Sequence, residues 1–597
     1  MHKSVSQKVV LFFIAGLFIL VMAIISRLYL LDKHFTHIDD IGVAWSILHL
    51  KDEMSSIDSQ CEESLIKSFT SCRYFLAKKQ SEELTLPTSE LGNFLQQYGL
   101  LEKARTIFFL YRSFNIVPLS WTYAPAQFYL TDFLLHPGMS YGEIKFWGRF
   151  PSLLFGVIAI LFLMYSVKYF ESSGNVGLSV CLVSLVMSTS LQSIIYAAQM
   201  ESYAIGIFSV SALTVLLGYF INKKEIGIKT ALAAGAAVAT LSMCQYQTLL
   251  FIPGFLLSFI VFRNPNVKII YPLIWGAGSF LFIAIPFVFS ILISRTNRSV
   301  SWNEGPNGEF AIQSHDPVFL KFFEVISNLP LVLESMLSPV PESSLYAQLF
   351  KWLLFILFAL GVTASFINKE KRSFLLFSIL TFATWFIFVI FGKLPFSPTR
   401  HSMVLIPLFA MFVAFGFSAV FRRLKVYALI NFIPILIISF WLYAFAIGYK
   451  IIIHERMDRF DEEFLDQTFK TFSVDIVVGE YTNSPYFMPK INRRPIVFNQ
   501  IHNPQDSNIN SSLQGIGIKP NIMVAVYGRT ELTDAALNNL YNNIAKQLQL
   551  PITKKITMIK KDESPSKVEV DWSSRTNNGT NSFFLYIFKV NNLDLTH

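Results

Sequence analysis

Long apolar runs recur along this chain, and they constrain its fold more than any other feature. The first covers residues 9–26 without a charged residue. A run of about 18 or more apolar residues is long enough to cross a bilayer as a helix. Further apolar segments follow at about 150–168, 176–195, 203–220, 229–244, 248–262, 269–293, 348–367, 374–391, 402–420 and 427–448. The sequence therefore predicts a polytopic α-helical membrane protein with about 11 transmembrane helices, in which the polar residues around Gln245 divide an overlong apolar stretch.

The composition supports this class. Hydrophobic residues make up 53% of the 597 residues and charged residues 15%, whereas an ordinary soluble protein has about 25% charged residues. The 59 phenylalanines argue against a disordered chain and a soluble globular one. The net charge of +9 does not point to nucleic acid in a chain of this kind, and membrane lipids are the expected surroundings. Four cysteines exclude a disulfide-dense scaffold.

The distribution of positive charge predicts the orientation of the spans. Lys3 and Lys8 precede the first run and place its start in the cytoplasm. With alternating spans, the predicted inner loops contain Lys223, Lys224, Lys229, Arg263, Lys268, Lys369, Lys371, Arg372, Arg422, Arg423 and Lys425. The short outer loops are nearly free of Lys and Arg, except at 393–401. This pattern puts the large segments 32–148 and 294–346, and the tail, on the outer side.

The tail differs in pattern from the rest and predicts a second domain. After about residue 450, β-rich stretches alternate with helical ones at about 458–470 and 531–548. The β-rich stretches are Asp475–Val478, Pro495–Phe498, Ile522–Tyr527 and Phe583–Val590. We therefore expect a transmembrane domain over 1–450 and an extracytoplasmic soluble α/β domain over 451–597. Within the first outer segment, 121–135 is apolar but short, which predicts a helix at the membrane surface.

Three carboxylates stand at predicted outer boundaries of the spans. Asp39 and Asp40 follow the first span, and Glu201 lies in a very short connection between two spans. Neighbouring carboxylates at such a boundary repel each other and are costly to desolvate, which suits a general base. On the residues alone, a solvated helix stop remains the commoner explanation of an Asp-Asp pair. A lone Glu in such a loop is an ordinary loop residue about as often as a functional one.

Four basic or titratable residues are candidates for binding an anion. Lys393, Arg400 and His401 lie in the outer loop that departs from the charge rule, and Arg149 opens the second span, with Pro151 at its start. Arg binds phosphate as a bidentate fork and Lys binds it as a point charge. Pairing of the loop cations with Asp39, Asp40 or Glu201 is the alternative. For Arg149 the alternative is a side chain that snorkels to the interface.

The cysteines leave two possibilities open. Cys61 and Cys72 share the first outer segment and would form either a disulfide or two free thiols. Cys181 and Cys244 fall in apolar spans, where we expect them to pack as small hydrophobic residues.

The order of these features resembles the polyprenyl-phosphate-sugar glycosyltransferases of the GT-C superfold, in particular the protein O-mannosyltransferase-like group and the lipid A aminoarabinose transferases. The resemblance covers roughly residues 10–450. The matching motifs are His37-Ile38-Asp39-Asp40, the Pro-containing stretch Tyr123–Tyr129, Arg149–Ser152, the acid at Glu201, and Gly392–Pro395 with Arg400-His401. The chain departs from the family pattern in having His401 where Tyr is usual, Ala124-Pro125 where a Pro pair is expected, and an insertion at about 52–105.

This resemblance implies a membrane glycosyltransferase that moves a sugar from a polyprenyl-phosphate donor to an extracytoplasmic lipid, glycan or protein acceptor. Asp39 or Asp40 would be the general base, Glu201 a further catalytic acid, and the reaction would invert the anomeric centre. Lys393, Arg400, His401 and Arg149 would bind the donor phosphate. A divalent metal is compatible with the acidic site, although no ligand spacing demands one. A bacterial inner membrane is the expected location, with the site and the C-terminus facing outward.

Two other functions fit parts of the pattern. A lipid-linked glycan polymerase, a ligase or an oligosaccharyltransferase-like enzyme would also need outward acids and phosphate-binding cations. A transporter or flippase would favour internal repeats and broken helices near the midplane. The sequence has no internal repeat, and its conspicuous charges cluster at the predicted outer boundary, which makes the transporter the weaker alternative.

Overall fold

The structure is a computed structural model of the whole chain. It describes residues 2–33, 96–99, 125–136, 141–172, 176–200, 202–284, 318–341, 346–390, 400–424, 433–456, 476–480, 496–499, 521–528, 557–558 and 584–591, with single positions at 44, 103, 106, 139, 344, 394 and 396. Two compact units are distinguished. The first comprises Met1–Leu31, Met54–Thr131 and Arg149–Ile452, and the second comprises Asp32–Glu53, Asp132–Gly148 and Ile453–His597. The predicted domain boundary after residue 450 stays a prediction.

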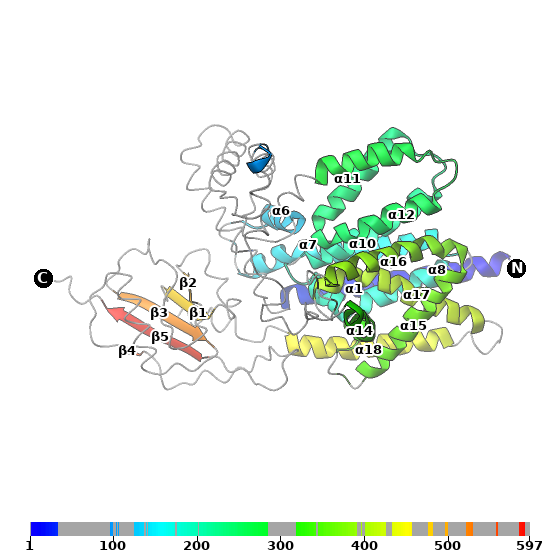
Figure 1. Cartoon of the computed structure of the whole chain (residues 1–597). Helices are drawn as coiled ribbons and strands as arrows, with labels where there is room; N and C mark the ends of the chain where they lie inside the picture. Colours follow the sequence, from blue (N-terminus) through cyan, green and yellow to red (C-terminus); the bar gives the residue numbers. More distant parts are fainter. Residues whose placement is uncertain are drawn as a thin grey trace. The chain divides into compact units, whose positions relative to one another are not determined.

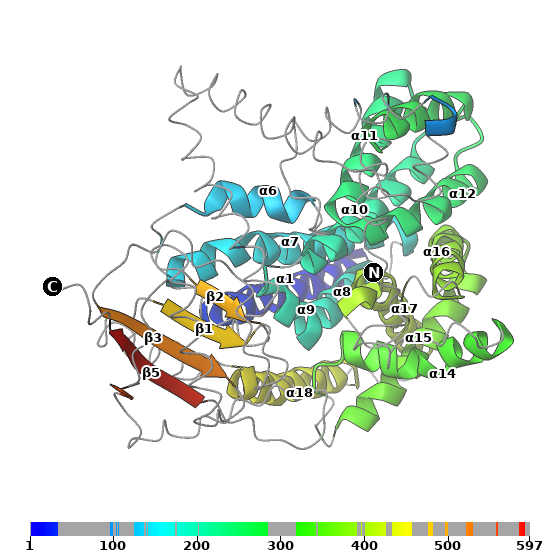
Figure 2. The same cartoon turned by 60° about the vertical axis from the view of Figure 1, so that its left-hand side comes forward.

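The first unit is built of helices (Figures 1 and 2). Its long α-helices are α1 (His2–Lys33), α7 (Tyr141–Phe170), α8 (Val176–Thr189), α10 (Tyr203–Asn222), α11 (Ile228–Cys244), α12 (Ile252–Phe262), α14 (Val318–Leu337), α15 (Ala347–Ile367), α16 (Arg372–Ile390), α17 (Ile406–Leu424) and α18 (Ile433–Arg456). Shorter helical pieces join them: α6 (Pro125–Leu134), α9 (Leu191–Ala197), η1 (Tyr246–Phe251), η2 (Pro272–Gly276), η4 (Lys369–Lys371) and η5 (Arg400–Leu405).

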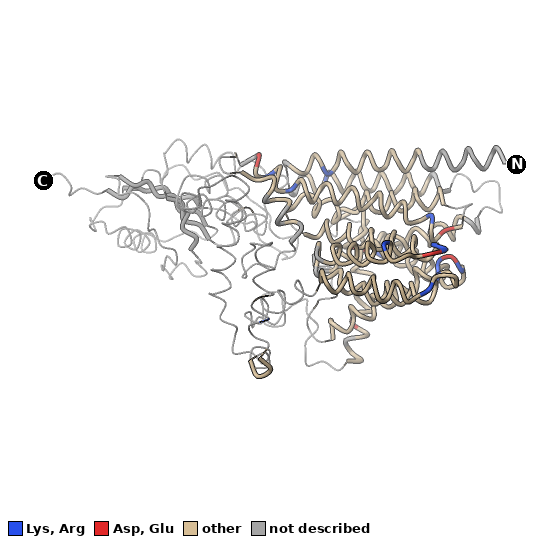
Figure 3. Tube along the Cα trace, turned by 90° about the horizontal axis from the view of Figure 1, so that it is seen from above, with Lys and Arg blue, Asp and Glu red and all other residues tan. Residues whose placement is uncertain are grey.

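The predicted spans correspond to helices in the structure. Among the described residues, seven helices are long and apolar enough to cross a membrane. The pair α8 and α9 passes the same test together and is bent by 62°, as in a broken span or a re-entrant loop. Three shorter apolar helices, at Ile228–Ser242, Gln247–Phe262 and Pro272–Ala284, lie within the remaining predicted segments, of which 285–293 is outside the described residues. In Figure 3, the Lys, Arg, Asp and Glu residues of the described helices lie mainly toward the helix ends. The chain is thus a polytopic helical membrane protein, as the apolar runs predict.

Helix α17 is the centre of the bundle. Its apolar span is 89% buried, against 28% for the span in α18. It packs closely on α15 because glycines face its backbone. A Cβ on Gly361 of α15 would collide with the carbonyl oxygen of Phe412, and one on Gly416 of α17 would collide with that of Leu357. Small residues at such crossings let two helix backbones approach closely inside a membrane.

Helix α14 lies within the predicted outer segment 294–346, whose side of the membrane stays a prediction. Its C-terminal half is buried, with Val332, Leu333, Met336 and Leu337 in the core. It packs against α15, α9 and α17. Its apolar residues recur every three or four positions, whereas Lys321, Glu324 and Glu334 interrupt any continuous apolar run. The segment therefore lacks the uninterrupted apolar run by which a span is predicted from the sequence.

Helix α7 corrects the expected position of Pro151. The helix begins at Tyr141, so Pro151 lies inside it rather than at its start. Proline in a helix interior removes one backbone hydrogen bond, and other groups can satisfy the freed carbonyl in a membrane protein.

The predicted surface stretch 121–135 does contain a helix, α6. Ser152 of α7 donates a hydrogen bond to Gln127 Oε1 of α6 at 3.2 Å.

The second unit carries a five-stranded sheet in the order β2-β1-β3-β5-β4. Its strands are β1 (Ile476–Glu480), β2 (Ile496–Asn499), β3 (Asn521–Gly528), β4 (Thr557–Met558) and β5 (Phe584–Asn591). β1 pairs in parallel with β2 and β3, and β5 pairs antiparallel with β3 and β4. All four predicted strands are confirmed, and β4 is additional. The predicted helices at about 458–470 and 531–548 lie outside the described residues.

Candidate functional site

The predicted site residues fall mostly in connections between helices. Asp39, Asp40, Glu201 and Lys393 lie outside the described residues. Arg400 and His401 begin the 3-10 helix η5, of which the structure describes the backbone at these two positions. Their roles stay predictions. The outcome for Cys61 and Cys72 also lies outside the described residues, whereas Cys181 and Cys244 are buried free thiols.

Arg149 is fully described, and it is buried rather than snorkelling. Its Nη1 donates a hydrogen bond to the carbonyl oxygen of Leu31 at 2.9 Å. Leu31 lies in the last turn of α1, where carbonyl groups lack partners within the helix and a positive charge is favourable. Arg149 therefore ties α7 to the end of α1, six residues before Asp39. Its role toward a phosphate stays a prediction.

A second buried arginine, Arg27, is absent from the sequence-based candidates. Its Nη1 donates to the carbonyls of Ala23 at 3.2 Å and Ser188 at 3.4 Å. Its Nη2 donates to the carbonyl of Met187 at 3.2 Å and to Ser193 Oγ at 3.0 Å. Met187 and Ser188 end α8, so the guanidinium group caps that helix C-terminus from the neighbouring α1. A charged residue between the apolar run 9–26 and the apolar residues that follow at 28–31 is the signal that could have found it.

The bend between α8 and α9 is fixed by contacts to other helices. Ser190 caps α9 by accepting a hydrogen bond from the backbone N–H of Ser193, and its own hydroxyl donates to the carbonyl of Met336 at the end of α14. Trp441 of α18 donates to Thr189 Oγ1 at 2.8 Å. Arg27, α14 and α18 therefore set the direction in which α9 leads into the connection that contains Glu201.

Three connections of the chain meet at the first turn of α10. A Cβ added to Gly206 would lie 2.7 Å from Val404 Cγ1 of η5 and 2.9 Å from Gln245 Cγ. Gln245 is the single residue between α11 and η1, and its backbone is extended. The connection after α9, the break at Gln245 and η5 are therefore neighbours. The connection after α9 contains Glu201, and η5 begins at Arg400. All three segments lie at a predicted outer boundary of the spans.

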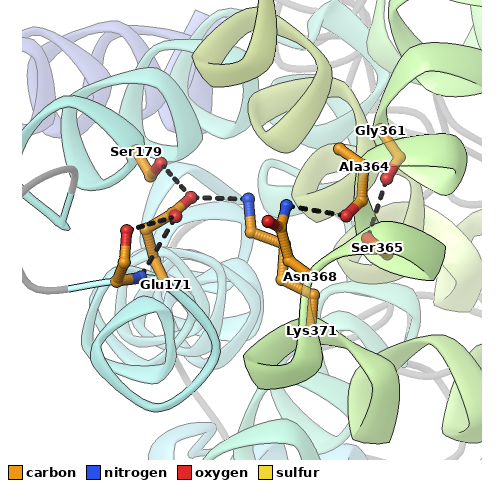
Figure 4. Close-up of polar contacts among 8 residues, drawn as sticks. Glu171, Ser179, Gly361, Ala364, Ser365, Asn368 and Lys371 are labelled. Atoms are coloured by element: carbon orange, nitrogen blue, oxygen red, sulfur yellow. Dashed lines mark hydrogen bonds and ion pairs between the residues drawn. The ribbon is translucent and has the colours of Figure 1, made fainter. Parts of the chain in front are cut away.

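A buried ion pair lies at the other end of α7 (Figure 4). Lys371 Nζ is 2.7 Å from Glu171 Oε2, and Ser179 donates to the same carboxylate oxygen at 3.0 Å. The ammonium group also lies 4.1 Å from the centre of the Phe415 ring. Glu171 and Arg149 are roughly 33 Å apart along α7 at 1.5 Å per residue. The ion pair is therefore separate from the candidate site, and Lys371 is not the exposed loop charge that the orientation argument uses.

The described residues include no group of three or more His, Cys, Asp or Glu that could hold a metal ion. The acids at 39, 40 and 201 lie outside that part of the chain.

These features define an integral membrane protein whose predicted site residues fall mostly in connections between helices. No protein-family model matches the chain. No curated protein matches it. Two crystal structures of ArnT from Cupriavidus metallidurans are similar at 12% identity, each over 78% of this chain and 87% of that protein. The TM-score is 0.40 for the apo state and 0.43 for the state bound to undecaprenyl phosphate. Similarity at this level assigns no activity to the chain.

Proposed function

We propose that this protein is a membrane glycosyltransferase that moves a sugar from a polyprenyl-phosphate donor to an extracytoplasmic lipid, glycan or protein acceptor. The observation that carries the proposal is the meeting of three connections at Gly206. It brings the residue after Glu201 and the helix that begins at Arg400 toward the same turn of α10. An acid beside a phosphate-binding cation at a membrane boundary is what transfer from a lipid phosphate requires.

The proposed reaction is one displacement at the anomeric carbon. Asp39 or Asp40 takes the proton of the acceptor hydroxyl as its oxygen bonds to that carbon. The bond to the phosphate oxygen breaks, and the polyprenyl phosphate leaves from the opposite face, so the anomeric centre inverts. Lys393, Arg400 and His401 stabilise the negative charge that develops on the leaving group, and Arg149 contributes from α7, beside the last turn of α1. Glu201 is a further acid of the site.

The proposed orientation puts the site and the C-terminal unit outside the cytoplasm, in a bacterial inner membrane. A reporter enzyme that works only outside the cytoplasm, fused after residue 597, is expected to be active, because alternation of the spans from a cytoplasmic N-terminus leaves the tail outside. The same reporter fused in the connection at 223–227 is the control and is expected to be inactive. Labelling of the C-terminus from the cytoplasm would contradict the orientation and the predicted side of every site residue.

The role of Arg400 is tested by thermal unfolding with and without a polyprenyl phosphate. Wild-type protein is expected to be stabilised by the lipid, because a ligand that binds only the folded state raises its stability by mass action. Arg400→Ala should lose most of this stabilisation. Arg400→Lys should lose part of it, because a point charge replaces the bidentate fork.

The alternative role of Arg400 is an ion pair with Asp39, Asp40 or Glu201. In that case Arg400→Ala would unfold at a lower temperature without lipid, and it would still be stabilised by the lipid as strongly as wild type. That result would exclude Arg400 from the phosphate site. Lys351→Ala, at a cation of α15 outside the candidate site, is the control for a simple change in net charge.

Donors that carry a monosaccharide or an oligosaccharide separate this function from a lipid-linked glycan polymerase or ligase.

A further inference from the structure

The hydroxyl group of Ser202 is used in an unusual way for its position. Ser202 directly follows Glu201 and occupies the N-cap of α10. A serine there usually accepts a hydrogen bond from a backbone N–H of its own helix. Ser202 makes no such bond. Its Oγ donates to Gln245 Oε1 at 3.3 Å instead, and both residues are buried. The side chain therefore links two segments that are 43 residues apart rather than capping its helix.

Gln245 stands where an apolar span is interrupted. A buried amide and a broken helix are both costly in a membrane unless other groups satisfy them. The aliphatic part of Gln245 packs against Gly206. A Cβ added to Gly206 would lie 3.3 Å from Gln245 Cβ and 2.9 Å from Gln245 Cγ. Its amide oxygen accepts the bond from Ser202. Gln245 thus holds the start of α10 through both its apolar and its polar part.

Acceptor atoms on both sides of this contact are buried without a hydrogen-bond partner in the described part of the chain. They are Gln199 Oε1, three residues before Ser202, and Gln247 Oε1 and Thr248 Oγ1, just after Gln245. Buried polar atoms are nearly always paired in folded proteins. A network that only stabilised the fold would be expected to pair them. These three atoms lie within three residues of Ser202 or Gln245 along the chain.

We propose that Ser202 and Gln245 are a positioning pair for the transfer reaction. Together they fix the chain next to Glu201 against the α11–η1 break, and Gly206 lets η5, which begins at Arg400, pack on the same turn. The inference rests on the proposed function. It adds two neutral residues to the site, neither of which touches the reacting atoms. Their effect is to hold the connections that carry Glu201 and Arg400 in a fixed relative position. These two residues are almost 200 positions apart in the sequence.

The test is a pair of single variants and their combination, assayed for transfer from a polyprenyl-phosphate sugar. Gln245→Met keeps the packing against Gly206 and removes the acceptor, and Ser202→Ala removes the donor. Each is expected to lower kcat about 10-fold to 100-fold, since a displacement of about 1 Å in a reacting group can cost 10²-fold. The KM for the donor should change little, because only alignment in the transition state is lost. The loss in the double variant should be smaller than the sum of the two single losses, because both variants remove the contact between Ser202 and Gln245.

Two controls separate positioning from folding. Ser202→Thr keeps the hydroxyl and is expected to retain most of the activity. Ser211→Ala removes another buried serine of α10, whose Oγ bonds only the carbonyl of Ile207 in its own helix, and it should leave kcat unchanged. If Gln245→Met does not accumulate as folded protein, the comparison of Ser202→Ala with Ser202→Thr carries the test.

Full turnover in folded Ser202→Ala, or strictly additive losses in the double variant, would overturn the positioning role while the proposed function stands. Wild-type protein that transfers no sugar from any polyprenyl-phosphate donor would overturn the proposed function, and the inference with it. That result is seen before any variant is compared.

Discussion

Asp39→Asn is expected to lower the rate of sugar transfer about 10²-fold to 10⁴-fold, the usual range for loss of a general base. Asn has nearly the same shape as Asp but cannot take up the proton of the acceptor hydroxyl. The fall should appear in kcat and in kcat/KM alike, because proton removal occurs in the transition state. The measurement is single-turnover transfer from a labelled polyprenyl-phosphate sugar by purified protein. Asp40→Asn should also be damaging, with the smaller effect of the two.

Asp32→Asn is the matched control for this experiment. Asp32 is another acid of the same segment, and it directly follows Leu31, whose carbonyl Arg149 binds. Its replacement should leave the rate unchanged. Full activity in both Asp39→Asn and Asp40→Asn would show that neither residue is the general base and that the acidic pair only ends the helix. The general base would then have to be sought elsewhere, first at Glu201.

Glu171→Gln is expected to destabilise the helical unit by about 3–5 kcal/mol, the usual cost of removing one partner of a buried ion pair. The substitution leaves the Lys371 ammonium buried without its carboxylate. The contact of the ammonium group with the Phe415 ring cannot compensate for a full charge. The unfolding temperature of the detergent-purified protein measures the effect. Transfer activity below that temperature should be preserved, because the pair lies roughly 33 Å from Arg149 along α7.

The double variant Glu171→Gln with Lys371→Met is the control for the ion pair. It removes both charges and keeps apolar bulk beside Phe415, so it should recover most of the stability that the single variant loses. An unfolding temperature equal to wild type in Glu171→Gln would show that the pair contributes nothing. A double variant no more stable than the single one would show that the carboxylate acts on its serine partners rather than on Lys371.

The candidate site residues are predictions from the sequence. Glu201, Lys393 and Arg400 were selected because polar residues in short outer loops are costly and need a reason. That reasoning also singled out Gln245, but only as a break between two spans. It could not find that Gln245 contacts Ser202, because the contact joins residues 43 positions apart. The apolar run 9–26 stops just before Arg27, whereas α1 continues to Lys33 and Arg27 is buried within the bundle.

The sequence by itself determined the class of the protein, the positions of the seven long apolar helices and the four main strands. These features depend on runs and alternations within about twenty residues, which is the range over which a helix crosses a bilayer or a strand shows one face. Only the tertiary structure decided that α14 joins the core, that Pro151 lies inside α7 and that Lys371 is buried with Glu171. It also decided which connections meet at Gly206. The physical reason is that burial, ion pairing and close backbone approach depend on which distant helices become neighbours, and no local pattern encodes that.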